Sequence, residues 1–288
     1  MDEARSRTGM GPDFFCVGAQ KGGTGWLYEQ LRVHPDFWMP PLKELHYFDR
    51  LWRTPRALRK AEGRIAAARQ SARDERDLKF LELMEAEGKR SEVDLERYAE
   101  LFSGKGELLS GDITPGYSTL EEELIERIVR RFSEAKVLFL ARDPVERAWS
   151  HLSMWVRHGT IEPFRPDDLE AITEHLRLPE VQRRSYPSQI VRRWRKHVRP
   201  ELFRVYFFDD IKRDPAAVRG GIISFLGGDA GKRSGNLAAG HNPKARMEKL
   251  EFTEGARAHL ARFFEDELKV CAEELGGAAV EWPGRYGG

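Results

Sequence analysis

The chain has 288 residues, and its 48 Lys and Arg against 47 Asp and Glu leave a formal net charge of +1. This length is enough to bury a substantial core without disulfide or metal support. The near-zero charge balance argues against a protein that binds nucleic acid through its net charge, because such domains carry a large basic excess. The composition therefore favours a globular protein with no nucleic-acid partner.

The two cysteines predict a reducing compartment. Cys16 lies in an apolar run and Cys271 follows Val270 in a predicted helix, which is typical of buried thiols rather than of a disulfide framework. Residues 1–7 are charged and lack the apolar segment of a secretory signal, and no stretch approaches the roughly 20 apolar residues that cross a bilayer. We therefore expect a cytoplasmic protein with no transmembrane segment.

Short apolar runs alternate with longer amphipathic segments along the chain. Strands are predicted at residues 14–17, 137–140 and 203–208, which are aromatic or β-branched and end at turn or helix signals. Helices are predicted at about 24–33, 95–102, 120–132, 144–157, 187–198, 215–226 and 253–275. Because helices of this length form crossover connections, we expect an α/β fold in three layers, with a central, mostly parallel sheet flanked by helices.

Residues 1–288 are predicted to form a single domain. Residues 53–90 are dominated by Ala, Arg, Lys and Glu, which favours a helical insertion that is exposed rather than part of the core. The segment 253–275 is expected to be a C-terminal helical segment. The glycine-containing stretch 227–240 is expected to be a surface loop.

The first predicted strand leads directly into the glycine-rich segment 18–25, GAQKGGTG. A strand, a glycine-rich turn and a helix N-terminus direct several backbone N–H groups to one point, which is an anion site. A Walker P-loop would place lysine at position 24 and would bind Mg²⁺ through the following hydroxyl. Here position 24 is Thr24 and the lysine is Lys21, so we expect a P-loop-type fold whose anion site requires no metal. The alternative is a glycine-rich turn without a ligand.

A second motif follows the second predicted strand. Asp143 is suited to cap a helix that begins at Pro144, which places Arg142 at the end of the strand and Ser150 two turns into the helix. Ligands bind outside these strand ends in open α/β sheets, so the guanidinium and the hydroxyl are suited to a second phosphate group. The alternative is an ordinary helix cap with a surface ion pair.

Together, the two motifs resemble those of the sulfotransferase superfamily that uses 3′-phosphoadenosine 5′-phosphosulfate (PAPS) as donor. The loop is similar to the family's 5′-phosphosulfate motif, and Arg142-Asp143-Pro144 with Arg147 and Ser150 is similar to its 3′-phosphate motif. The resemblance implies a transferase that releases adenosine 3′,5′-bisphosphate. It also implies that the donor is bound by Lys21, Gly22, Gly23, Thr24, Gly25, Trp26, Arg142 and Ser150.

The segment 43–49, KELHYFD, is similar to the Lys-Glu-x-His-Phe-Phe segment of the heparan sulfate type and its bacterial relatives. The resemblance implies that Glu44 is the catalytic base, with Lys43, His46 and Asp49 around the acceptor. His46 is then either an orienting partner of Glu44 or an alternative base, and Lys21 neutralises charge on the leaving group. Without the resemblance, the alternation of polar and apolar residues in this segment is also typical of an edge strand.

Two segments depart from the family's pattern. Ile113 stands where the heparan sulfate type has a lysine that contacts the polysaccharide, and Ala238, Ala239 and Gly240 replace a late Lys-Gly-Arg loop. The basic role of that loop would then fall to Lys232, Arg233 or Lys244. The acceptor therefore stays open among a small molecule, a lipid and a carbohydrate, as does the choice between O- and N-sulfation.

The resemblance thus predicts in-line transfer of a sulfuryl group from PAPS to a hydroxyl or an amine. The alternatives are a P-loop kinase or other nucleotide phosphotransferase, which would need Mg²⁺, and a non-catalytic nucleotide-binding module. A further basic segment suggests either a polyanionic partner or an amphipathic helix with a solvated basic face, and the four-residue spacing of Ile190, Trp194 and Val198 favours the helix. Its cations are Arg183, Arg184, Arg192, Arg193, Arg195, Lys196 and Arg199.

Overall fold

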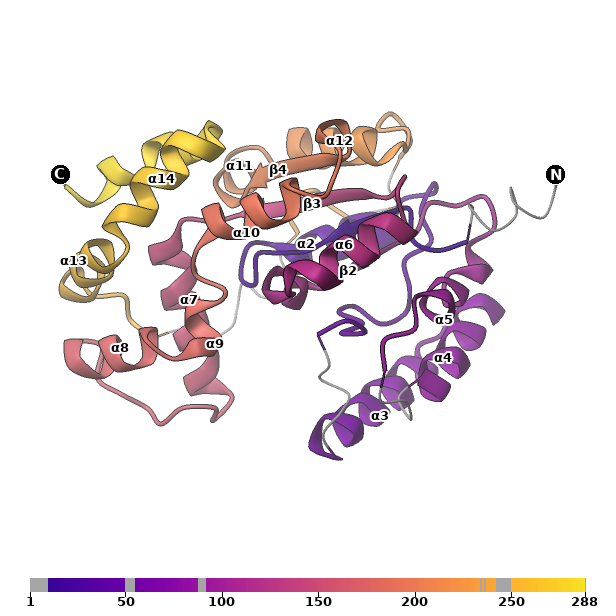
Figure 1. The fold of residues 1–288 in the computed structure, drawn as a ribbon, viewed down its shortest axis with the longest axis horizontal. Coiled ribbons are helices and arrows are strands. Elements are labelled where there is room, and N and C mark those ends of the chain that lie inside the picture. The colour runs from indigo at the N-terminus through magenta and orange to yellow at the C-terminus, as the bar shows by residue number, and fades with distance from the viewer. Residues whose placement is uncertain are drawn as a thin grey trace.

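The computed structural model describes residues 10–49, 55–87, 92–233, 235, 237–241 and 250–287. At its centre is a four-stranded parallel sheet in the order β2-β1-β3-β4 (Figure 1). The strands are β1 (Phe14–Cys16), β2 (Gly111–Ile113), β3 (Lys136–Ala141) and β4 (Phe203–Phe207). The predicted α/β fold is therefore confirmed. No strand was predicted at β2, because three residues that include a glycine and an aspartate form no apolar run.

Helices cover both faces of the sheet. They are α2 (Thr24–Arg32), α3 (Pro55–Gln70), α4 (Glu75–Glu87), α5 (Leu95–Glu100), α6 (Glu122–Arg131), α7 (Pro144–Arg157), α8 (Leu169–Leu176), α9 (Pro179–Gln182), α10 (Pro187–Arg195), α11 (Phe208–Arg213), α12 (Pro215–Leu226), α13 (Glu254–Phe263) and α14 (Glu265–Leu275). The predicted bounds of α7 and α12 agree with the structure at both ends. Asp143 and Asp214 cap these two helices, each followed by proline at the first helical position.

The prediction of one helix over 253–275 is wrong, because the structure has two helices there. Phe264 lies between α13 and α14 with φ −105° and ψ 15°, which is not helical. Its ring is buried, with 1% of the residue exposed, and packs on Phe263 and Tyr186. We infer that this tertiary packing ends α13 at a position where the sequence carries no glycine or proline.

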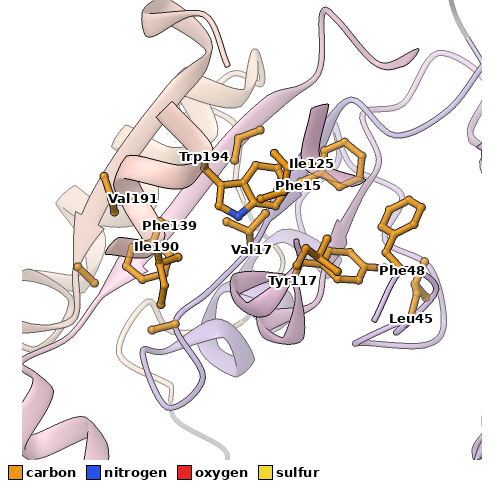
Figure 2. Close-up of a cluster of buried hydrophobic side chains, with 14 of the residues drawn as sticks. Phe15, Val17, Leu45, Phe48, Tyr117, Ile125, Phe139, Ile190, Val191 and Trp194 are labelled. Carbon is orange, nitrogen blue, oxygen red and sulfur yellow. The ribbon is translucent and has the colours of Figure 1, made fainter. Parts of the chain in front are cut away.

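Alternate residues of the strands point into two separate cores. Phe15, Val137 and Phe139 face a core that includes Ile125 of α6 and Trp194 of α10 (Figure 2). On the opposite face, Phe14, Cys16, Leu138 and Leu140 pack against α2, α11 and α12. This two-residue period gives the three layers of the fold. Cys16 and Cys271 are free and buried, as predicted.

The helices of the predicted insertion contribute to the core, so the expectation that they are exposed is wrong in part. Ile65 of α3 and Phe80, Leu81 and Met84 of α4 are buried. Asp77 is buried too, and it accepts hydrogen bonds from Trp38 Nε1 at 3.0 Å and Arg73 Nε at 2.8 Å. The few apolar residues gather on one face of each helix, which the overall composition of the segment does not reveal.

The order of the strands places two loops beside one another. From β1 the chain moves to β2 on one side, and then to β3 and β4 on the other. The loops that follow β1 and β3 therefore meet at the carboxyl edge of the sheet, where ligands bind in folds of this type. Among the described residues, no helix is both long and apolar enough to cross a membrane.

Candidate active site

The loop after β1 ends at an uncapped helix. Gly23 is the N-cap of α2, has φ +101° and provides no side-chain hydrogen bond, and the first turn of α2 contains no acidic residue. The first N–H groups of a helix have no partner within the helix. Their dipoles, together with the absence of a carboxylate, favour a bound anion at this end of α2.

The geometry of the loop requires a glycine at position 22. A Cβ atom there would lie 2.4 Å from the carbonyl oxygen of Leu140 in β3. The loop therefore lies directly against β3, and the carbonyl oxygen of Lys21 accepts a hydrogen bond of 2.9 Å from Arg142 Nη1. The two motifs, which lie far apart in the sequence, are in contact.

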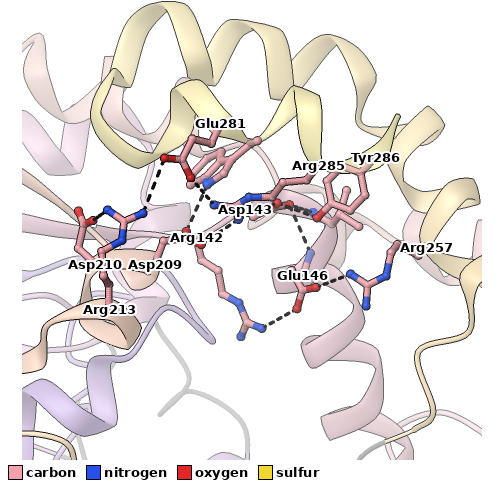
Figure 3. Close-up of polar contacts among 12 residues, drawn as sticks. Arg142, Asp143, Glu146, Asp209, Asp210, Arg213, Arg257, Glu281, Arg285 and Tyr286 are labelled. Atoms are coloured by element: carbon pink, nitrogen blue, oxygen red, sulfur yellow. Dashed lines mark hydrogen bonds and ion pairs between the residues drawn. The ribbon is translucent and has the colours of Figure 1, made fainter. Parts of the chain in front are cut away.

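Arg142 is held in place by several groups (Figure 3). Its Nη2 lies 3.3 Å from Glu146, which also pairs with Arg257 at 2.7 Å. The guanidinium lies over the ring of Phe208, 4.7 Å from its centroid. The side chain is only 13% exposed, and its buried Nε atom has no partner among the described residues. The alternative interpretation, an ordinary helix cap with a surface ion pair, is therefore only half right. Asp143 does cap the helix, but the ion pair of Arg142 with Glu146 is largely buried on the Arg142 side.

The C-terminal segment fixes the start of α7. Asp143 accepts a hydrogen bond from Val145 N at 2.9 Å through one carboxylate oxygen, as the predicted cap requires. Its other oxygen accepts a hydrogen bond of 2.7 Å from the hydroxyl of Tyr286, and Arg285 lies 3.5 Å from it (Figure 3). Residues at the end of the chain therefore help to orient the strand end that carries Arg142.

The remaining predicted donor residues lie on α2 and α7. Ser150 is half-buried in α7. Trp26 Nε1 donates a hydrogen bond of 2.6 Å to the carbonyl oxygen of Ala239, so part of the late loop packs on α2. Lys232 pairs with Asp36 at 2.6 Å, beyond the C-terminal end of α2 and away from the phosphate loop. Arg233 is exposed, and Lys244 lies outside the described residues.

The segment 43–49 is not a strand, so the edge-strand interpretation is wrong. Glu44 has φ +62° and His46 has φ +57°, and Lys21 has φ +71°. Among the described residues, these three are the only non-glycine residues with positive φ. Such conformations are unfavourable and cluster at functional sites. Leu45, which lies between Glu44 and His46, is buried. Phe48 follows them and packs on Tyr117, with ring centroids 5.0 Å apart (Figure 2).

Glu44, His46 and Asp49 form a connected polar network. Glu44 accepts a hydrogen bond from Lys43 Nζ, and its other carboxylate oxygen lies 3.5 Å from His46 Nε2. His46 Nδ1 lies 2.7 Å from Asp49 Oδ2. Arg64 of α3 donates to the carbonyl oxygens of Lys43 and Glu44. Arg64 was not predicted from the sequence, because it is one of many arginines and lysines in the segment 53–90 and no motif sets it apart from them.

The network fixes the charge of both predicted acid–base groups. Burial raises the pKa of Glu44, but the hydrogen bond from His46 and the charge of Lys43 outweigh it and hold this pKa well below its usual range. Burial lowers the pKa of His46, but hydrogen bonds to Asp49 and Glu44 outweigh it and raise the pKa to about 9. Near neutral pH, Glu44 is therefore a carboxylate and His46 an imidazolium.

This pKa predicts a pH-dependent stability. A histidine whose pKa rises from 6.5 to about 9 on folding stabilises the protein fully below pH 6.5, and this stabilisation is lost as the pH rises through 9. We expect the free energy of unfolding to fall by about 3 kcal/mol across that range through His46. Urea unfolding at each pH measures it. The His46→Gln variant should lack this component, and identical pH profiles would contradict the assignment.

A buried aspartate supports the same segment from β2. Asp112 accepts hydrogen bonds from the hydroxyls of Thr114, Tyr117 and Tyr98 at 2.6, 2.7 and 2.9 Å. Burial raises its pKa, which the three donors oppose. The hydroxyl of Tyr117 also accepts a hydrogen bond from the backbone N–H of Tyr47 at 3.2 Å. The family resemblance drew attention to Ile113 in this part of the chain, but it did not predict that the neighbouring Asp112 supports the segment 43–49. Ile113 itself is buried in the core.

Gly116 leaves room for Asp49. A Cβ atom at position 116 would lie 2.1 Å from Asp49 Oδ2 and 3.3 Å from His46 Nδ1. We expect Gly116→Ala to displace Asp49 and to lower the pKa of His46, which an NMR titration measures. Gly63→Ala is the matched control, because a Cβ atom there meets nothing within 4 Å. An unchanged His46 titration in Gly116→Ala would contradict the predicted displacement.

The basic segment around α10 is an amphipathic helix, as favoured. Ile190, Val191 and Trp194 are buried. Three of its cations pair with carboxylates from elsewhere in the chain, namely Arg192 with Glu274, Lys196 with Glu122 and Arg199 with Glu134. These tertiary ion pairs supply the carboxylates that the local sequence lacks.

A family model described as "Sulfotransferase family" matches residues 12–230, which include both phosphate motifs and the segment 43–49. The chain belongs to the sulfotransferase family. Members of this family are transferases that use PAPS, so the prediction of a sulfotransferase is confirmed. No curated protein sequence matches the chain.

Solved structures share the fold over almost the whole chain. A sulfotransferase from Alicyclobacillus acidocaldarius is 24% identical with a TM-score of 0.64, covering 94% of this chain and 98% of its own. The sulfotransferase domain of the Synechococcus PCC 7002 olefin synthase is 16% identical with a TM-score of 0.52, covering 93% and 96%. The sulfotransferase domain from the curacin biosynthetic pathway is 15% identical with a TM-score of 0.54, covering 92% and 97%.

Proposed function

We propose that this sulfotransferase moves a sulfuryl group from PAPS to a hydroxyl or amine of a small-molecule, lipid or carbohydrate acceptor. The observation that carries the proposal is the contact of the Lys21 loop with Arg142 beside the uncapped end of α2. This arrangement provides two separate sets of anion donors at one sheet edge, which suits the two phosphate-bearing ends of PAPS. The two buried thiols support the further proposal of a cytoplasmic location.

The residues present fit the donor. When bound, PAPS supplies the sulfuryl group and an adenosine bisphosphate leaving group. Lys21, Thr24 and the first backbone N–H groups of α2 would hold the 5′-phosphate end, and the Lys21 ammonium would offset negative charge that develops on the leaving oxygen. Arg142, whose Nε atom has no partner among the described residues, would hold the 3′-phosphate together with Ser150.

Glu44 is proposed as the base, because it is ionised and lies on a segment whose Leu45 and Phe48 are buried in the core. A general base works best when its pKa lies near neutrality. In the free protein Lys43 and His46 hold the pKa of Glu44 too low for this. An acceptor hydroxyl or amine that displaces Lys43 from Glu44 removes one of these charges, so the pKa of Glu44 rises as the acceptor binds. His46, held by Asp49, orients the carboxylate.

Binding of adenosine 3′,5′-bisphosphate in EDTA tests the donor assignment. At 100 times its dissociation constant, a ligand stabilises the folded state by about 2.7 kcal/mol, which a thermal shift detects. We expect the bisphosphate to stabilise the protein in EDTA and ATP·Mg²⁺ to have little effect. Selective stabilisation by ATP·Mg²⁺ would instead support the kinase alternative. Donor binding without transfer to any member of a broad acceptor set would support the non-catalytic module.

A further inference from the structure

Two arginines and a histidine form a cluster that includes residues on either side of Ser150 on α7. Arg147 and His151 lie on α7 and are 0% and 1% exposed. Arg147 Nη2 donates a hydrogen bond of 2.6 Å to Ser185 Oγ, and its Nη1 lies 3.4 Å from His151 Nδ1. The neighbouring Arg184 is half-buried and donates through Nη1 to the carbonyl oxygen of Glu180 at 2.8 Å.

The cluster lacks a matching negative charge. No ion pair within 4.0 Å joins Arg147 or Arg184 to a carboxylate of the described residues. The Nε atoms of both arginines are buried, and within the described part of the chain they have no hydrogen-bond partner. Buried polar groups are normally satisfied, and an unpaired buried charge is unfavourable. This arrangement suits an anion that the described part of the chain does not supply.

The cluster lies close to two parts of the candidate site, because Arg147 and His151 flank Ser150 on α7, and Arg183, next to Arg184, lines one cavity with Asp49 of the segment 43–49. Burial lowers the pKa of His151 to about 2, and the charges of Arg147, Arg184 and Lys21 act in the same direction. His151 therefore stays neutral and offers one ring N–H. Burial also lowers the pKa of Arg184, while the charges of Asp49 and Glu180 oppose it. Asp49 is the carboxylate that holds His46, and it lines one cavity with Arg183, the residue before Arg184.

Arg184 also differs from three other cations of its segment, which have carboxylate partners. Arg192, Lys196 and Arg199 pair with carboxylates on the surface. A cavity of about 590 Å³ borders Asp49, but its charged lining mixes Glu92, Glu121 and Glu123 with Arg127 and Arg183. The mixed charges of that cavity do not favour an anion, whereas no carboxylate pairs with Arg147 or Arg184 within the described residues.

We propose that Arg184, supported by Arg147 and His151, forms an anion subsite that receives a negatively charged group of the acceptor. The acceptor is then a hydroxyl- or amine-bearing molecule with a carboxylate, sulfate or phosphate group. This inference rests on the proposed function. In the proposed donor site the anionic groups of PAPS are held by the Lys21 loop, Arg142 and Ser150, and Arg183, next to Arg184, lines the same cavity as Asp49 of the segment 43–49.

Sodium sulfate is the probe, titrated into protein saturated with PAPS and followed by thermal shift against sodium chloride at matched ionic strength. We expect a saturable stabilisation by sulfate in the wild type. Arg184→Gln removes a charge-assisted hydrogen-bond donor and should weaken sulfate binding about tenfold or more. Arg183→Gln, which alters the exposed arginine next to it, is the matched control and should keep the wild-type affinity. Equal sulfate affinity in the two variants would overturn the proposal.

Two further measurements in the same thermal-shift experiment test whether sulfate binds at the proposed acceptor subsite. Sulfate that binds with adenosine 3′,5′-bisphosphate but not with PAPS would overturn the proposal, because the cluster would then hold the sulfuryl group of the donor. Arg147→Met should also reduce the sulfate response, and a full wild-type response in it would contradict the role of the buried cation. If neither nucleotide binds, the proposed function fails, but sulfate titration of the free protein still tests Arg184.

Discussion

Replacing Glu44 with glutamine is expected to lower the rate of sulfuryl transfer by about 10²–10⁴-fold, the usual contribution of a positioned general base. Glutamine keeps the shape of the side chain but cannot accept the proton of the acceptor. The affinity for adenosine 3′,5′-bisphosphate should stay within about twofold of wild type, because Glu44 is not among the proposed donor contacts. Turnover of a labelled donor measures the rate, and isothermal calorimetry measures the affinity.

Glu62→Gln is the matched control for this substitution. Glu62 is an exposed glutamate on α3, near Arg64 in the sequence but outside the polar network of Glu44. Its variant should retain wild-type turnover. Circular dichroism establishes whether both variants are folded. A folded Glu44→Gln protein with near-wild-type turnover would remove Glu44 from the mechanism.

Replacing Lys21 with alanine is expected to lower turnover by about 10²–10³-fold, as the loss of one preorganised charge at the reacting centre typically does. The contact between the loop and Arg142 uses the backbone carbonyl oxygen of Lys21, not its side chain. The conformation of the loop should therefore be retained when the ammonium group is removed. The loss should therefore fall mainly on the maximal rate. Steady-state kinetics with saturating donor separates this effect from weaker donor binding.

Lys232→Ala is the control for Lys21→Ala, and it also tests whether Lys232 takes over the basic role of the family's late Lys-Gly-Arg loop. Because Lys232 pairs with Asp36 beyond the far end of α2, its loss should leave both the turnover and the bisphosphate affinity unchanged. A large loss of bisphosphate affinity in Lys232→Ala would show that this lysine leaves Asp36 to bind the 3′-phosphate. Near-wild-type turnover in Lys21→Ala would refute the role of the loop lysine.

Local signals in the sequence were enough to locate most of the elements. α7 and α12 begin at Asp-Pro pairs, where a side chain caps the helix and proline occupies the first helical position. β1 and β3 are apolar runs that meet a glycine-rich turn and a helix cap. Such signals act within a few residues, so they can be read before anything is known of the fold. β2 and the break at Phe264 carry no comparable local signal.

The residues of the candidate site also fall into those with a local signal in the sequence and those without one. Lys21, Arg142 and Glu44 were found through motifs whose residues are neighbours in the sequence. Arg64 binds the segment 43–49 directly and Asp112 supports it through Tyr117, and no spacing in the sequence relates either residue to the segment. Gly116 matters only because Asp49 approaches it.

The 48 basic and 47 acidic residues of the chain nearly balance, but their numbers do not tell which of them form ion pairs. The α/β class, the two phosphate motifs and the family can be recognised from the sequence alone, since each depends on residues that are neighbours or on their order. Which charges are paired becomes known only when the chain is folded. Three of the basic residues around α10, Arg192, Lys196 and Arg199, meet carboxylates from distant parts of the chain, whereas Arg184 does not within the described residues. A charge interacts over distances in space, which the order of residues does not specify.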